Sequence, residues 1–151
     1  MILFLDFDGV LHPVHDGEFA GPPVFCHLPR LERLLREFPR VDVVITSKWR
    51  EHLSLEILRE FFSEDIRPRV VGMTPLTQPN SLGYMQARRE EAVIAWLQEH
   101  GMHEGHWVAL DADDWQFPNH RDRLVACIPQ VGFDDQTEAS LRAHFERWRK
   151  S

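Results

Sequence analysis

The sequence has few cysteines, few lysines and no long apolar run. Its two cysteines, Cys26 and Cys127, lack the spacing of a metal site and make a poor disulfide framework, so we expect a reduced, cytoplasmic protein. No apolar stretch approaches the length that is needed to span a bilayer. The N-terminus has no basic region and becomes acidic at Asp6, which is unlike a secretory signal peptide.

The length and composition predict an ordinary globular domain. We expect a single domain over residues 1–151, because this length is sufficient for one hydrophobic core. The apolar fraction is 43% and no internal repeat is visible. The net charge of −7 argues against broad, non-specific binding to nucleic acid, but it allows a small phosphorylated substrate held by a local basic group.

Two carboxylates follow the first apolar segment, and they are the most informative feature of the chain. Residues Ile2–Leu5 predict a strand buried on both faces, as in a parallel sheet. Asp6 and Asp8 come next, and alternation along an extended chain places them on the same side. Gly9 then allows a turn. Two adjacent negative charges are unfavourable unless a cation or a chemical role compensates them, although an acidic turn is the simpler alternative.

Strands alternate with helices along the rest of the chain. Apolar runs predict further strands near residues 41–45, 69–72, 106–110 and 123–128. Apolar residues at helical spacing predict helices near residues 28–38, 53–61, 86–100 and 141–148. This alternation predicts an α/β fold with a mainly parallel central sheet of about five strands, covered by helices on both faces.

Polar residues at the ends of other predicted strands have both structural and functional interpretations. Thr46 and Ser47 precede a helix, where hydroxyl and backbone N–H groups bind anions, but in isolation a simple helix cap is the more common explanation. Asp111 opens a second acidic cluster that includes Asp113 and Asp114 and that is also typical of a loop. Arg89 opens the third helix, where surface exposure is the usual role of an arginine.

Taken in order, these features resemble the haloacid dehalogenase (HAD) superfamily of phosphotransferases. The resemblance extends from Leu3 to about Ile128 and includes Asp-x-Asp-Gly, a Thr/Ser strand end, a basic helix start and an acidic fourth strand end. Residues 44–50 and 72–75, with Arg89 and the later Trp96-Leu97, are most similar to the HAD domain of bacterial RNA-repair (Swiss Army Knife) proteins. The family implies a three-layer, Rossmann-like fold without a large cap domain.

The resemblance also implies a phosphatase mechanism. Asp6 would attack phosphorus and form an aspartyl-phosphate, and Asp8 would act as the general acid and base. Mg²⁺ would bind between Asp6, the backbone carbonyl of Asp8, and Asp111, since it prefers carboxylate, carbonyl and water oxygens. The ion would offset the repulsion between the carboxylates and the charge of the phosphate.

Phosphate binding is assigned by the same resemblance. Thr46 or Ser47 would bind the phosphoryl oxygens, and Arg89 would neutralise the nucleophile and the incoming phosphate. The third motif of the family usually has lysine, so Arg88 and Lys48 remain alternatives to Arg89.

The fourth motif differs from the family at Ala112, so either Asp113 or Asp114 would supply the second acidic contact. Ala112 also favours an alternative function, a catalytically weak regulatory or phosphate-binding module with the same fold. A dehalogenase would direct Asp6 at carbon, but it would not need Asp8 as an acid. Three histidines form a candidate metal site whose spacing is more typical of an exposed turn: His100, His103 and His106.

The spacing of the motifs leaves little chain for a cap over the site. Residues 9–45 must also form a helix and most of a strand, so the remainder, about residues 12–27, is a flap at most. Residues 48–88 must form a helix, a strand and a loop, so they are also too few for a cap domain. Because open sites suit extended substrates, we expect a phosphate on a nucleotide or polynucleotide end. Trp49 or Trp115 is a candidate for stacking on a base, although core packing is commoner for tryptophan.

Overall fold

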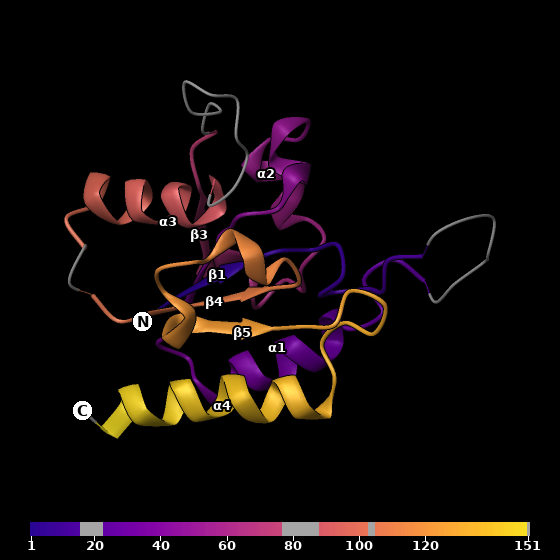
Figure 1. The fold of residues 1–151 in the computed structure, drawn as a ribbon. Helices are drawn as coiled ribbons and strands as arrows, with labels where there is room; N and C mark the ends of the chain where they lie inside the picture. The colour runs from indigo at the N-terminus through magenta and orange to yellow at the C-terminus, as the bar shows by residue number, and fades with distance from the viewer. Residues whose placement is uncertain (16–22, 77–87, 103–104, 151) are drawn as a thin grey trace.

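The structure is a computed structural model that describes residues 1–15, 23–76, 88–102 and 105–150 (Figure 1). Five parallel strands form one sheet in the order β3-β2-β1-β4-β5. The strands are β1 (Ile2–Leu5), β2 (Asp42–Ile45), β3 (Val70–Met73), β4 (Trp107–Asp111) and β5 (Leu124–Ala126). The α-helices are α1 (Leu28–Glu37), α2 (Leu55–Arg59), α3 (Arg88–Glu99) and α4 (Asp135–Lys150). Short 3₁₀ helices are η1 (Lys48–Glu51), η2 (Arg67–Arg69), η3 (Asp114–Gln116) and η4 (Arg121–Arg123).

The side chains of β1 alternate between two hydrophobic clusters, one on each face of the sheet. Phe4 belongs to the cluster that includes Trp96 of α3, and their rings meet edge to face at 5.7 Å. Leu5 belongs to the cluster that includes Leu31 of α1 and Leu141 of α4. Figure 1 shows α3 on one side of the sheet and α1 with α4 on the other. The predicted parallel, three-layer α/β fold is therefore confirmed.

The second predicted helix is shorter than the apolar pattern suggests. Instead of running from residue 53 to residue 61, α2 begins after Ser54, whose Oγ accepts the N–H of Ile57 at 3.3 Å. It ends at Arg59, whose guanidinium donates to the carbonyl of Val70 at 2.7 Å. The cap by Ser54 marks the start of α2, and the chain turns after Arg59, so Leu53 and Phe61 lie outside the helix.

No cap domain is inserted in the described part of the chain, in agreement with the prediction. The connection from β1 to β2 contains α1, and the connection from β2 to α3 contains only η1, α2, η2 and β3 among the described residues. Cys26 and Cys127 are both free thiols. Among the helices of the described residues, none has the length and apolar character to cross a membrane.

Candidate active site

The predicted site residues meet at the carboxyl edge of the sheet, where β1 and β4 are neighbours. The N–H of Asp6 donates to the carbonyl of Leu110 at 3.1 Å, which aligns Asp6 with Asp111 on the next strand. Thr46 follows β2 and donates its N–H to the carbonyl of Leu5 at 2.9 Å. The order of the strands reverses between β1 and β4, and open α/β sheets bind ligands at this point.

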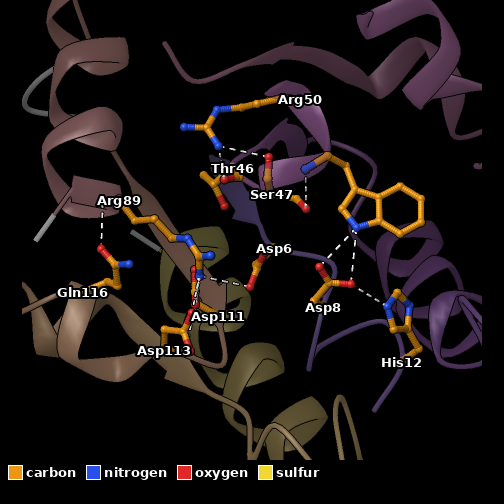
Figure 2. A network of polar contacts seen from close by, with 11 residues as sticks. Asp6, Asp8, His12, Thr46, Ser47, Arg50, Arg89, Asp111, Asp113 and Gln116 are labelled. Carbon is orange, nitrogen blue, oxygen red and sulfur yellow. Dashed lines mark hydrogen bonds and ion pairs between the residues drawn. The ribbon is translucent and has the colours of Figure 1, made fainter. Parts of the chain in front are cut away.

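Arg89 lies among three carboxylates, as Figure 2 shows. Its Nη1 donates to Asp111 Oδ1 at 2.7 Å, to Asp113 Oδ2 at 3.0 Å and to Asp6 Oδ2 at 3.1 Å. Gln116, a residue that the sequence did not indicate, accepts the backbone N–H of Arg89 at 3.3 Å and holds the first turn of α3 over the site. One guanidinium thus balances three carboxylates, so the site is short of positive charge.

The burial of these groups changes their acidity. Burial, followed by the charge of Asp111, raises the pKa of Asp6 well above its usual range, although Arg89 opposes the change. Burial also raises the pKa of Asp111 to about 6. Burial disfavours the charged form of Arg89, but the three carboxylates outweigh this effect and raise its pKa. A further cation at this place would relieve the excess negative charge.

Asp111 has a carboxylate oxygen without a hydrogen-bond partner. Its Oδ1 accepts from Arg89 and from the N–H of Asp113, the latter at 2.8 Å. Its Oδ2 is buried and unpaired. An unpaired buried carboxylate oxygen is unfavourable, and it is the type of ligand that Mg²⁺ prefers. No three His, Cys, Asp or Glu side chains of the described residues form a ready metal cluster. An ion here would therefore need backbone, water or substrate oxygens as well.

The departure from the family pattern at Ala112 has a packing reason. Gly9 has a φ of +76°, and a Cβ at this position would lie 2.9 Å from the Cβ of Ala112, so the two chain segments are in close contact. The carboxylate of Asp113 reaches Arg89, whereas Asp114 is exposed and pairs with Arg121 at 3.4 Å. Of the two alternatives left by the sequence, Asp113 lies in the site and Asp114 does not.

Asp8 has different partners from Asp6. Because β1 ends at Leu5, the alternation of a strand does not fix the directions of these two side chains. Its half-exposed carboxylate accepts the Nε1–H of Trp49 at 3.2 and 3.3 Å and contacts Nε2 of His12 at 2.8 Å. Nδ1 of His12 accepts the N–H of Phe25 at 3.2 Å, so the ring hydrogen lies on Nε2 and donates to Asp8. Figure 2 shows Asp6 pointing toward Arg89 and Asp8 pointing toward His12. His12 gave no signal in the sequence, because its four-residue spacing from Asp8 falls in a turn.

Trp49 is a packing residue as well as a hydrogen-bond donor. Its ring contacts Phe7, Phe25 and Phe61, with centroid distances of 5.6, 5.2 and 5.7 Å. These contacts favour core packing over base stacking for Trp49. Trp115, the other candidate, is 47% exposed.

Thr46 and Ser47 lie at the predicted edge of the sheet, and both are buried. Ser47 Oγ accepts the N–H of Trp49 at 3.2 Å, so it caps η1. The guanidinium of Arg50 donates to the carbonyls of Thr46, Ser47 and Thr74 at 2.7, 3.0 and 3.0 Å. Arg50 therefore ties the ends of β2 and β3 together, a role that the sequence did not reveal. Thr74 Oγ1 is buried and has no partner, so a further hydroxyl lies at this edge.

A pocket of about 230 Å³ lies beside Arg89. It is lined by Lys48, Arg50, Glu51, Arg88, Arg89, Asp113, Trp115 and Gln116. The two sequence alternatives to Arg89, namely Lys48 and Arg88, line this pocket, while Arg89 makes the contact with Asp6.

The three histidines that were a candidate metal site are only partly described. His103 lies outside the described residues. Nδ1 of His100 bonds to the carbonyl of Trp96 at 2.8 Å, and the two rings stack at 3.9 Å. His106 precedes β4, and its carbonyl accepts the N–H of Ile2 at 3.0 Å, at the opposite edge of the sheet from Asp6. His100 and His106 thus have separate structural roles.

A comparison with protein families matches residues 2–137 to the family described as "HAD domain in Swiss Army Knife RNA repair proteins". No curated protein and no solved structure matches the chain.

Proposed function

The chain belongs to the HAD domains of the Swiss Army Knife RNA repair family, and on this premise we propose that it is a Mg²⁺-dependent phosphomonoester hydrolase. HAD domains are generally phosphatase-type hydrolases. The observation that supports the proposal most directly is the buried carboxylate of Asp6, 3.1 Å from Arg89, beside the unpaired Oδ2 of Asp111. This arrangement provides a nucleophile, a phosphate-neutralising cation and an oxygen for a metal ion in one place.

Asp6 and Asp8 divide the chemistry between them. A carboxylate oxygen of Asp6 forms a bond to phosphorus while the bond from phosphorus to the ester oxygen breaks. Asp8 gives its proton to that departing oxygen. Water then attacks the phosphorus of the aspartyl-phosphate, and Asp8 removes a proton from the water. Inorganic phosphate leaves, and both carboxyl groups return to their initial states.

The remaining groups bind and orient the substrate. Thr46, Ser47 and Arg89 bind the phosphoryl oxygens in this proposal, and Arg89 also holds Asp6 in place. Mg²⁺ would be held by Asp6, Asp111 and the backbone carbonyl of Asp8, and when bound it neutralises the phosphate and the carboxylates. The unpaired Oδ2 of Asp111 fits this role, because it supplies a buried, anionic oxygen.

The proposed substrate is a phosphate on a nucleotide or polynucleotide end. The family description names RNA repair proteins, and the described residues include no cap domain to enclose a small metabolite. The two free cysteines support a reducing compartment, and we retain the cytoplasm as the proposed location.

The non-catalytic alternative depended on Ala112. Because Asp113 reaches Arg89, a second acidic side chain is available despite Ala112, which favours the catalytic proposal. A dehalogenase would have no use for an acid at Asp8, and the two hydrogen bonds that orient Asp8 favour phosphatase chemistry instead.

The proposal is tested by the hydrolysis of p-nitrophenyl phosphate with and without Mg²⁺. We expect activity that chelator removes and that the substitution Asp6→Asn abolishes. Full activity in Asp6→Asn, or indifference to chelator, would contradict the proposal.

A further inference from the structure

The pocket beside Arg89 has a local excess of positive charge on an acidic protein. Four cationic side chains and two carboxylates line it, although the whole chain has a net charge of −7. Arg89 and Asp113 pair with each other in the active site, and without them three cations face one carboxylate. The cationic residues come from two places: η1 supplies Lys48 and Arg50, and the start of α3 supplies Arg88 and Arg89. A concentration of cations against the overall charge indicates a surface for an anionic ligand.

Arg89 and Arg50 hold parts of the active site together. Arg89 bonds to the three carboxylates of the active site, and Arg50 bonds to backbone carbonyls at the ends of β2 and β3. Lys48 is exposed and forms no ion pair with any residue that the structure describes. Lys48 and Arg88 both line the pocket, while the contact with Asp6 is made by Arg89, so the pocket has cations in addition to the phosphate-neutralising group. A single phosphate at the nucleophile gives no reason for a second pair of cations.

An exposed aromatic ring borders the same pocket. Trp115 is 47% exposed, and its neighbour Gln116 is bonded to the backbone of Arg89, which links the position of this ring to the active site. Bases stack on such rings without requiring a particular sequence. The pocket volume of about 230 Å³ is smaller than most sites that enclose a whole ligand, which suits one segment of a longer chain.

From these observations we propose that the pocket is a second-phosphate subsite for polynucleotide ends. The terminal phosphate lies at Asp6, Lys48 and Arg88 bind the adjoining phosphodiester, and Trp115 stacks on a base. This inference rests on the proposed phosphatase function and adds the residues that would bind the nucleotide next to the terminal phosphate. A phosphopeptide or a sugar phosphate lacks the combination of a second phosphate and a base, so neither would use all of these groups.

The first test measures kcat/KM for two substrates in the same variants. One substrate is p-nitrophenyl phosphate, and the other is a five-nucleotide oligonucleotide with a phosphate at its 3′ or 5′ end, each version tested separately. We expect Lys48→Gln and Trp115→Leu to reduce kcat/KM for the oligonucleotide about tenfold more than for p-nitrophenyl phosphate, the scale of one stacked base or phosphate contact. Lys150→Gln, which removes the same charge at the exposed end of α4, should leave the ratio unchanged. Equal losses on both substrates would overturn the subsite.

The second test measures binding without turnover. A fluorescent oligonucleotide with a terminal phosphate is titrated into Asp6→Asn protein, with and without Lys48→Gln. We expect weaker binding in the double variant and a dependence on log[salt] that is shallower by about one. Equal competition by a phosphoserine peptide or glucose 6-phosphate would overturn the proposed substrate class. The two proposals fail separately: absence of p-nitrophenyl phosphate hydrolysis contradicts the phosphatase, whereas a salt dependence unaffected by Lys48→Gln contradicts the subsite.

Discussion

His12 donates a hydrogen bond of 2.8 Å to Asp8, and the backbone of Phe25 fixes its direction. Because Nδ1 of His12 accepts the N–H of Phe25, the ring hydrogen is on Nε2 and faces Asp8. Trp49 gives Asp8 a second donor, and its ring lies 6.2 Å from that of His12. The proposed acid and base is therefore held by two residues that the substrate need not touch.

The substitution Trp49→Phe tests whether this orientation matters. It removes the Nε1–H and keeps an aromatic ring against Phe7 and Phe25. We expect kcat to fall about tenfold, the scale of one hydrogen bond to a charged group, while KM stays nearly constant. The matched control is Trp148→Phe, which removes an indole near Arg40, far from the site. A changed KM with an unchanged kcat would indicate that Trp49 acts on substrate binding instead.

The substitution Asp8→Asn separates chemistry from binding. It removes the proton donor but keeps the backbone carbonyl and an oxygen that accepts from His12 and Trp49. We expect kcat to fall by roughly 10²–10⁴. Stabilisation by Mg²⁺ in thermal unfolding should persist. Loss of the Mg²⁺ effect in Asp8→Asn would show that the side chain itself is a ligand.

The substitution Asp111→Asn tests the metal site. Mg²⁺ should raise the melting temperature of the wild-type protein and have little effect on the variant, because the anionic Oδ2 is lost. Without Mg²⁺ the variant should be at least as stable as the wild type, since Arg89 retains Asp6 and Asp113 as partners. Equal Mg²⁺ stabilisation in both proteins would mean that the fourth motif has been assigned wrongly.

The stability of the metal-free protein should depend on pH through Asp111. Its pKa is raised from 3.8 to about 6 in the folded state, so the folded state binds the proton more tightly than the unfolded state. The contribution of Asp111 to stability is therefore present at low pH and is lost as pH rises toward about 6. The measurement is thermal unfolding of wild type and Asp111→Asn in chelator from pH 4 to pH 7. The melting temperature of the wild type should fall steadily relative to that of the variant over this range. A difference that is independent of pH would contradict the proposed burial of this charge.

The fold could be predicted from the sequence because its main patterns are local. The apolar run of β1 and the leucine spacing of α1 are each visible within ten residues. Once the strands are predicted, the polar residues that follow them can be read directly from the sequence. The length of α2 could not be predicted from periodicity, because the cap by Ser54 sets its start and the chain turns after Arg59 although the apolar spacing continues to Phe61.

The site could be predicted only in part, because several contacts join distant segments. Asp6, Asp111 and Arg89 lie together as the motif order predicts. The contact of Trp49 with Asp8 spans 41 positions and leaves no pattern in the sequence. Adjacent residues on a helix point about 100° apart, so only the three-dimensional structure distinguishes Arg89 from Arg88.

The central claim is that Asp6 forms a covalent phosphoryl intermediate. Asp8→Asn protein retains the nucleophile but lacks the base for the second step, and p-nitrophenolate leaves readily without a proton. We therefore predict that Asp8→Asn protein, mixed with p-nitrophenyl phosphate and Mg²⁺ and quenched in acid, gains the mass of one phosphoryl group, which peptide mapping assigns to Asp6. An unmodified protein during measurable turnover, or a phosphoryl group on any other residue, would contradict this account.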